Sequence, residues 1–434
     1  MIEPAAAAAP LALRELLDSV RTHYPAVEAA RARVRAARGA RTSAGALANP
    51  VLAYGVENAP LPGRVAPPME REAMATVTLP LEAVYQRGPR VRRAAAEVRA
   101  AEADAAAAAQ QAMLDAAHVY YRAALAQIGL EAARDLAAWL DTVVAYNRTR
   151  VNEGVAAEAD LLRSELERDR AAAEATMQEA DLARARADLA SYFANVDPDT
   201  PVEAMIPSVV VDDAPLTLPY TPGLAGTPAP ADSAAVREAG APVPGRPQVR
   251  AARERLAGAS AAVTVERRLL LREIGAVVGT KRSAGTTSLV AGLSLPVPLF
   301  DQNRGETRRA LAERDAAAFE LAGVERNARA ELAGAAEAAR LLTARATALS
   351  TRGPDGIPVY LARADEARRI TLGAYREGAI PLLNVIDAAR TWGEARMAYY
   401  QTLFAQHEST LMLLAAQGID LAAALPTPTP GGNR

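Results

Sequence analysis

The stretch YREGAIPLLNVIDA, at residues 375–388, decides how the rest of the chain is interpreted. Gly378 stands between two runs that favour helix, and a residue in the left-handed conformation commonly ends a helix. A shorter match occurs at residues 152–160, where NEG is followed six residues after its glycine by Asp160, as REG is followed by Asn384. The pattern predicts two helical hairpins, one in each half of the chain, with a glycine at each turn.

Two further matches support a duplication. PAVEAARAR at 25–33 recurs as PQVRAARER at 247–255, and TLP at 78–80 recurs as SLP at 294–296. Matches in the same order at similar offsets indicate one architecture built from two halves. The predicted divisions are a first repeat at 1–195, a proline-rich connector at 196–246, a second repeat at 247–418 and a disordered tail at 419–434.

Both halves have the same order of elements. Strands are indicated by alternation of apolar and polar residues, as in Val77, Thr78 and Leu79. In the first half we expect a helix at about 11–42, strands at about 50–57 and 75–82, a long helix at about 90–150 and a return helix at about 156–194. In the second half we expect a helix at about 247–271, strands at about 272–280 and 288–299, a long helix from about 305 that is broken at 353–358, and a return helix at about 381–417. A helix of roughly 60 residues spans about 90 Å, more than a small globular domain needs.

The composition favours long helices in close contact. Hydrophobic residues make up 50% of the chain but aromatic residues only 4%, and alanine, the best helix former, dominates. A net charge of −2 gives no electrostatic reason to expect nucleic acid. No run of 18 strongly apolar residues predicts a transmembrane helix. The start, Met1-Ile2-Glu3-Pro4, does not have the pattern of an export signal.

The four strands have the length of membrane-spanning strands. An open sheet cannot lie in a bilayer, because lipid does not satisfy the backbone groups of its edges. The smallest closed barrels need about eight strands. If these strands span a membrane, several chains must therefore share one barrel.

The order of strand, strand, long helix, glycine turn and return helix, used twice, resembles the TolC family of outer-membrane efflux proteins. The resemblance covers about residues 11–418. Its specific pieces are LREL at 13–16 leading to Pro25, ANP at 48–50, YREG at 375–378, LLNVIDA at 382–388, and Arg390-Thr391 and Glu394-Ala395-Arg396 with Tyr399. YGVEN at 54–58 is similar to the heavy-metal (CzcC-type) branch. The Gly-Gly that often follows strand two in the family is replaced by Gln86-Arg87-Gly88-Pro89.

The resemblance implies a mainly α fold with a small β part, in which three chains form a 12-stranded β-barrel on an α-helical barrel. It implies an outer-membrane channel subunit of a tripartite (RND-type) efflux system, a passive exit duct for heavy-metal cations or drugs. The implied partners are two further copies of the chain, a periplasmic adaptor protein, an inner-membrane RND-type pump and outer-membrane lipid. The implied location is the outer membrane, with the helical part in the periplasm.

The same resemblance places candidate residues at the periplasmic entrance. These are Asp160, Tyr375, Asn384 and Asp387, and the turn glycines Gly154 and Gly378 are expected to form the tips that contact the adaptor. Asp387 matches an inner acidic position, Asn384 replaces a second acid, and Tyr375 and Asp160 match positions that hold the closed entrance together. Ile380 stands where some members have a gating arginine. For each residue, an ordinary place on a helix surface is the alternative.

No catalytic or cofactor site is predicted. The three histidines, His23, His118 and His407, have no second histidine or cysteine at ligand spacing, and the chain has no cysteine, so no metal site is expected. Residues 279–283, GTKRS, do not fit a phosphate-binding loop, and 279–287 is better interpreted as a hairpin loop. An enzyme is therefore disfavoured. A soluble or surface coiled-coil scaffold or stalk stays open as the alternative function.

Overall fold

The computed structural model describes residues 10–59, 70–193, 202–216, 245–269, 274–295 and 297–425. The chain separates into two compact units, and each unit combines segments from both repeats. The helical unit contains residues 1–29, 107–246 and 327–434, and the sheet unit contains residues 30–106 and 247–326. Among the described residues, no helix has the length and apolar character required to cross a membrane.

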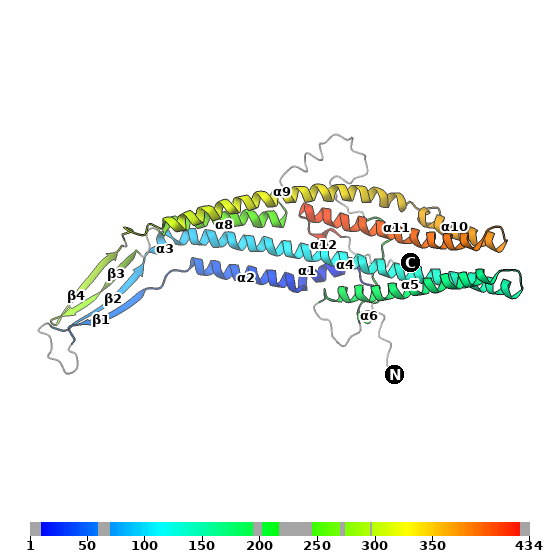
Figure 1. Cartoon of the computed structure of the whole chain (residues 1–434). Coiled ribbons are helices and arrows are strands. Elements are labelled where there is room, and N and C mark those ends of the chain that lie inside the picture. The colour runs from blue at the N-terminus through cyan, green and yellow to red at the C-terminus, as the bar shows by residue number, and fades with distance from the viewer. Residues whose placement is uncertain are drawn as a thin grey trace, which may run out of the picture. The chain divides into compact units, whose positions relative to one another are not determined.

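The sheet unit consists of four strands and the helical segments that lead into and out of them (Figure 1). The strands are β1 (Val51–Glu57), β2 (Glu72–Pro80), β3 (Gly275–Ser283) and β4 (Thr286–Ser294). The helices are most of α2 (Pro25–Gly45), α3 (Glu82–Tyr85), the first part of α4 (Arg87–Asn152), α8 (Pro247–Arg268) and the first part of α9 (Arg304–Leu349).

The sheet joins the two repeats at its centre. Its strands are antiparallel in the order β1-β2-β3-β4, so the β1–β2 hairpin of the first repeat pairs with the β3–β4 hairpin of the second. The ladder between β2 and β3 runs from the pair Ala73↔Arg282 to the pair Pro80↔Gly275. Within one chain, β1 and β4 are edge strands, whose outer backbone groups have no ladder partner.

The turn between β3 and β4 corrects the expectation of a loop at 279–287. β3 continues to Ser283 and β4 begins at Thr286, so only Ala284 and Gly285 form the turn. Their φ angles are 50° and 79°. Positive φ at both central residues is the signature of a two-residue type I′ hairpin turn, which matches the twist of the flanking strands. Strand pairing therefore extends further than the sequence suggested.

The register divides the sheet into an apolar face and a polar face. Side chains alternate along each strand, and direct partners share a face. The apolar face carries Leu52, Tyr54, Val77, Leu79, Val278, Leu289 and Leu293. The polar face carries Glu57, Glu72, Thr76, Thr78, Lys281, Ser283, Ser288 and Ser294. Leu52, Leu289 and Leu293 are 74–78% exposed in the single chain, so its apolar face is uncovered.

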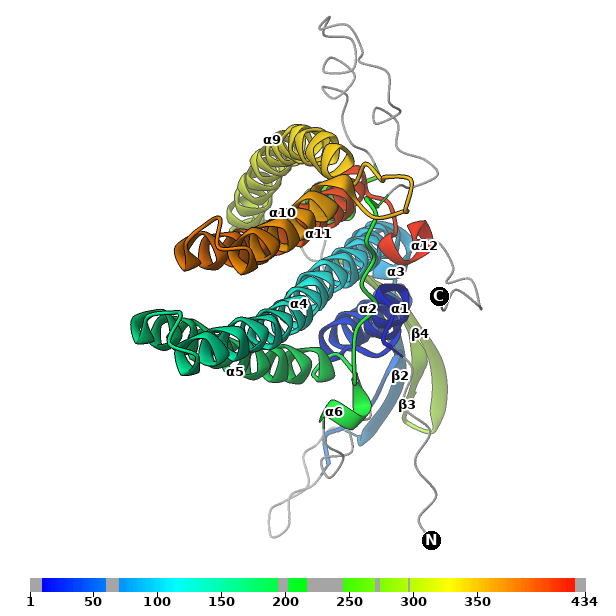
Figure 2. The same ribbon diagram turned by 90° about the vertical axis from the view of Figure 1, so that its right-hand side faces the viewer.

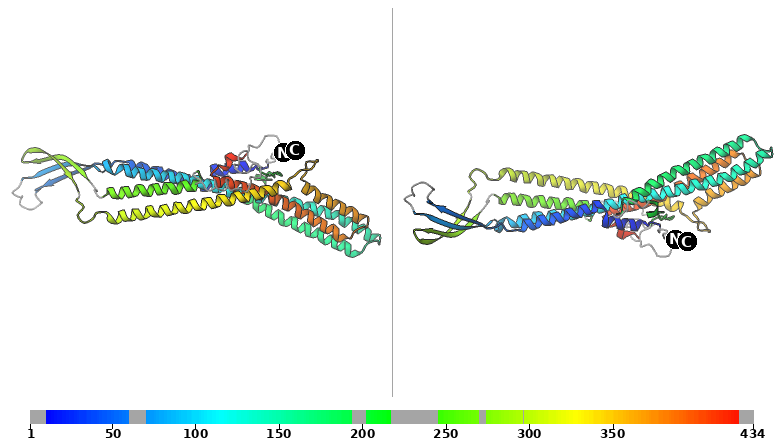
Figure 3. Two further views of the ribbon diagram at one scale, coloured as in Figure 1. Left: turned by 90° about the horizontal axis from the view of Figure 1, so that it is seen from above. Right: turned by 90° about the horizontal axis from the view of Figure 1, so that it is seen from below.

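The helical unit contains two long hairpins, seen end-on in Figure 2 and from two further sides in Figure 3. One hairpin is the second part of α4 with α5 (Glu158–Ala190), and the other is α10 (Val359–Arg376) with α11 (Leu382–Gln417). The shorter helices of this unit are α1 (Leu13–His23), α6 (Val202–Met205) and α12 (Leu421–Ala424). The expected break at 353–358 is confirmed, because α9 ends at Leu349 and α10 begins only at Val359.

The core of the helical unit gathers apolar side chains of α1, α4, α11 and α12. Leu16, Leu17 and Leu411 have no exposed surface. Many of the α4 side chains between them are alanines, which allow the helix backbones to approach closely. The hydroxyl of Tyr120 donates to the backbone oxygen of Val210 at 2.8 Å, so the polar tip of this buried aromatic is satisfied. Val210 belongs to the described part of the connector, 202–216.

Two segments differ from expectation. The helix expected at 11–42 is divided into α1 and α2, because Pro25 disfavours helical backbone at Tyr24, which is extended (φ −65°, ψ 132°). The first residues of the expected disordered tail are folded. Asp420 caps α12 by accepting from the backbone N–H of Ala422 at 3.1 Å, and Leu421 is fully buried.

Candidate functional site

The two turn glycines close the hairpins of the helical unit in the same way. Gly154 and Gly378 have φ angles of 72° and 77°, the left-handed region that glycine adopts without a steric penalty. The N–H of the following residue returns to a helix carbonyl in each case, Val155 to Arg150 at 2.9 Å and Ala379 to Ala374 at 2.9 Å. Because of these glycines, backbone carbonyls at the ends of α4 and α10 are hydrogen-bonded without side-chain caps.

Tyr375 links α10 to α4 next to these tips. Its side chain is 4% exposed, and its hydroxyl donates to Oδ1 of Asn147 at 2.6 Å. Asn147 is completely buried, and its Nδ2 has no hydrogen-bond partner among the described residues. The ring of Tyr375 also meets the ring of Tyr146 edge to face, and the hydroxyl of Tyr146 donates to the backbone oxygen of Arg376 at 3.0 Å. Two hydrogen bonds and one edge-to-face ring contact thus join the two hairpins.

Asp160 affects Tyr375 through its charge and is not hydrogen-bonded to it. Burial raises the pKa of the Tyr375 phenol, and the carboxylate of Asp160 in the first turn of α5 raises it further. The hydrogen-bond partner of the Tyr375 hydroxyl is Asn147. The signal for Asn147 in the sequence was a polar residue close to the apolar residues Val143 and Val144 of α4, which are buried as well.

Asn384 and Asp387 lie on a different face of α11. Both are exposed, whereas Val385 and Ile386 between them are buried against α4 and α10. The structure therefore brings Tyr375 and Asp160 near one another but leaves Asn384 and Asp387 outside that cluster. An exposed carboxylate on a helix face that the single chain does not cover can line an aqueous passage.

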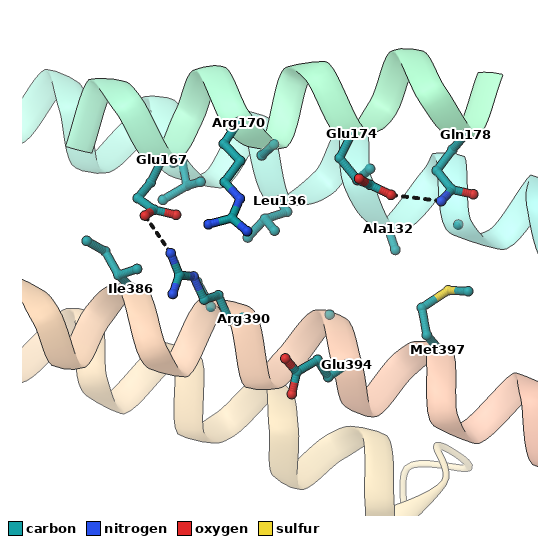
Figure 4. A pocket seen from close by; sticks show the side chains of 16 residues that line it. Ala132, Leu136, Glu167, Arg170, Glu174, Gln178, Ile386, Arg390, Glu394 and Met397 are labelled. Atoms are coloured by element: carbon teal, nitrogen blue, oxygen red, sulfur yellow. Dashed lines mark hydrogen bonds and ion pairs between the residues drawn. The ribbon is translucent and has the colours of Figure 1, made fainter. Parts of the chain in front are cut away.

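A groove lies between α11 and the α4–α5 hairpin (Figure 4). Its volume is about 420 Å³. Small residues form much of its lining, namely Gly129, Ala132, Ala133, Ala171, Ala389 and Gly393. Arg390 of α11 crosses it to pair with Glu167 of α5 at 2.5 Å, and this hydrogen-bonded pair, followed by the charges of Asp387 and Glu394, raises the pKa of Arg390.

Both tryptophans of the chain form a second link between the hairpins. The guanidinium of Arg368 in α10 lies 4.1 Å from the ring centre of Trp392 in α11 and 5.5 Å from that of Trp139 in α4. Nε1 of Trp392 donates to Oδ1 of Asp365 at 2.6 Å. Desolvation lowers the pKa of Arg368, but the cation faces two aromatic rings and an acid that stabilise it. This cluster was not predicted from the sequence, because Trp139 is more than 200 residues away from Asp365, Arg368 and Trp392.

The described residues contain no group of three or more histidines, cysteines or acids arranged to hold a metal ion. His118 faces Glu408, with 3.1 Å between Nδ1 and Oε1, and His407 is buried with Nε2 2.9 Å from the backbone oxygen of Ala214. Lys281 lies within β3 and pairs with Glu72.

The chain belongs to the outer membrane efflux protein family, whose profile matches residues 16–195 and 244–418. It is 29% identical over 159 residues to the cobalt-zinc-cadmium resistance protein CzcC of Cupriavidus metallidurans (strain ATCC 43123 / DSM 2839 / NBRC 102507 / CH34), a match that covers 36% of each chain. The curated relative is thus matched over about a third of its length.

Solved outer-membrane channels have the same fold. The structure of OprN superimposes with a TM-score of 0.73 at 21% identity, covering 94% of this chain and 90% of that one. The structure of CusC superimposes with a TM-score of 0.73 at 16% identity, covering 94% of this chain and 92% of that one. The structure of VceC of Vibrio cholerae superimposes with a TM-score of 0.73 at 19% identity, covering 94% of this chain and 96% of that one. The TolC-type fold expected from the sequence is confirmed at this level.

Proposed function

We propose that this chain is one of three subunits of an outer-membrane duct that serves as the passive exit of an efflux system. Its four strands would form one third of a 12-stranded barrel, and its hairpins would form a helical tunnel in the periplasm. The observation that carries the proposal is the sheet itself. It has one uncovered apolar face and two free edges, β1 and β4, which a bilayer tolerates only if other strands pair with them.

The strand count and the resemblance to the family support the three-fold arrangement. Four strands are too few to close, and three copies give twelve. A coiled-coil scaffold, the alternative, would have no use for a sheet whose exposed face is apolar. That observation favours the duct.

The exported substrate and the partners belong to the same proposal. The likeness to a cobalt-zinc-cadmium resistance protein supports heavy-metal cations as cargo. A periplasmic adaptor would contact the tips at Gly154 and Gly378, where two exposed hairpin turns are available, and an inner-membrane pump would supply the energy.

Asp387 would give this duct its ion preference. Three copies around a three-fold axis would form an acidic ring at the periplasmic entrance, and Asn384 would add a neutral polar ring about one helical turn away. Acidic rings attract cations and repel anions in a narrow passage. The entrance should therefore prefer cations and be blocked by multivalent cations. Tyr375 and Asp160 would hold the closed entrance.

The proposal is tested by recording currents of the purified protein in planar bilayers. The wild type should conduct, prefer cations and be blocked by a trivalent cation. Asp387→Ala should lose both the cation preference and the block, whereas Glu320→Ala, which removes an exposed acid of α9, should keep them. A protein that never conducts contradicts the duct. A conducting Asp387→Ala variant with unchanged selectivity and block contradicts the place of Asp387 in the aperture.

A further inference from the structure

The charges at one end of the sheet separate by face. This end lies next to the β3–β4 turn. On the polar face, Glu57 is the direct cross-strand partner of Glu72. Glu72 pairs with the ammonium of Lys281, and the hydroxyl of Ser283 donates to its Oε1 at 2.8 Å. The charged groups of this face thus include two acids and one base, and the base is already engaged.

The apolar face ends instead in arginine. Arg282 is the register partner of Ala73, so it shares a face with Val77 and Leu289. Arg71 directly precedes β2 at the same end of the sheet, two residues before Ala73. Both arginines are exposed, and neither guanidinium makes a hydrogen bond or ion pair with another residue of the described chain.

The position of these arginines leaves them accessible in an assembly. They belong to β2 and β3 or lie next to them, at the centre of the sheet, whereas neighbouring subunits would pair at β1 and β4. The opposite end of the same face carries Leu79, Ala276 and Leu293, which have no charge. Among the described residues, the apolar face is therefore basic at the turn end only.

We propose that Arg71 and Arg282 bind the anionic phosphate headgroups of membrane lipid around the turn end of the strands. This inference rests on the proposed membrane duct. An arginine on the lipid face is costly at the middle of a bilayer but not near its surface, where the side chain can extend into the headgroup layer. A guanidinium matches the geometry of a phosphate and can donate two hydrogen bonds to it. The acids on the other face would repel the same headgroup, so the binding is confined to the outside.

Native mass spectrometry of the detergent-purified protein tests this site. The probes are phosphatidylglycerol, phosphatidylcholine and inorganic phosphate. The wild type should retain phosphatidylglycerol in preference to phosphatidylcholine. The double variant Arg71→Gln/Arg282→Gln should retain roughly tenfold less, since two charge-assisted contacts per chain are lost. The matched variant Arg33→Gln/Arg35→Gln, which removes two exposed arginines of α2, should behave as the wild type.

Each contrary result is distinguishable. Equal retention of phosphatidylglycerol by the double variant and the wild type overturns the site. Displacement of the lipid by millimolar inorganic phosphate also overturns it, because it indicates a general anion site. Arg282→Lys keeps the charge and should retain an intermediate amount of phosphatidylglycerol. This variant is the control for misfolding of the double variant. Wild-type protein that needs no detergent and does not conduct contradicts the duct itself, whereas a conducting protein with unaltered lipid retention contradicts only the lipid site.

Discussion

The contact between Tyr375 and Asn147 is the most enclosed polar link between the two hairpins. Both side chains are buried, and the amide Oδ1 receives the hydroxyl at 2.6 Å. A buried polar group that loses its partner bears the full cost of desolvation, which is larger than the net gain from a typical hydrogen bond. Removing the Tyr375 hydroxyl should therefore cost more free energy than the hydrogen bond itself contributes, because Asn147 would stay buried without this donor.

Tyr375→Phe should lower the free energy of unfolding by about 1–3 kcal/mol, because Asn147 would keep its burial and lose its donor. The measurement is chemical unfolding of the purified protein followed by circular dichroism. Tyr360→Phe, in the same helix, is the control, since the Tyr360 hydroxyl has no hydrogen bond to another described residue. Equal stability of the two variants would show that the Tyr375 link carries no energy.

His407 gives the helical unit a dependence on pH. It is 1% exposed, and burial lowers its pKa below the ordinary value of 6.5, although the backbone oxygen of Ala214 and the charge of Asp212 oppose this. A lowered pKa means that the unfolded chain binds the proton more readily. The stability that His407 contributes is therefore present above about pH 6.5 and is lost as the pH falls through the folded-state pKa.

The corresponding measurement is the thermal midpoint between pH 7.5 and pH 5 for the wild type and for His407→Gln. The wild type should lose more stability than the variant over this range. Glu408 acts in the opposite direction, because burial raises its pKa, and it is present in both proteins, so the difference between them isolates His407. Parallel curves for the two proteins would show that His407 does not titrate on unfolding.

At the scale of elements, the sheet depends on a glycine at the junction of the two repeats. Gly279 of β3 is the partner of Thr76 in β2. A Cβ at position 279 would lie 2.2 Å from the backbone oxygen of Ala75 and 2.7 Å from Cα of Thr76. These are backbone atoms, which cannot move without disturbing the ladder. Gly292 of β4 has nothing within 4 Å of the same hypothetical atom.

Gly279→Ala should therefore disrupt the pairing of β2 with β3, whereas Gly292→Ala should leave the sheet intact. The two variants share the same change in composition and in strand propensity. The readout is the heat-resistant oligomer on semi-native gels, together with the β signal in circular dichroism. A fully assembled Gly279→Ala protein would show that the β2–β3 ladder adapts, against the geometry described.

The same elements show what the sequence could predict. The hairpin turns were predictable because glycine alone adopts a positive φ cheaply, and Gly154 and Gly378 do so. The extent of β3 was not, because Gly279 suggests a loop unless its neighbour Thr76 is known. Asn147 was missed for the same reason, since its partner is 228 residues away. Local conformation is encoded locally, but contacts between hairpins depend on the packing of the whole unit.

At the scale of the whole molecule, the single chain leaves the edges and the apolar face of its sheet uncovered. The outer backbone groups of β1 and β4 have no ladder partner, and the apolar face of the sheet carries leucines that are more than 70% exposed. A lone sheet of this kind would aggregate in water and could not lie in lipid. In the proposed assembly, both problems would be solved by pairing β1 of one chain with β4 of the next until the sheet closes.

The molar mass of the detergent-solubilised protein, measured by light scattering and corrected for bound detergent, tests the central claim most directly. The account predicts a single species of three times the chain mass of 45.5 kDa that requires detergent to stay in solution. A monodisperse species of 45.5 kDa that keeps its β signal and stays soluble without detergent would contradict the account.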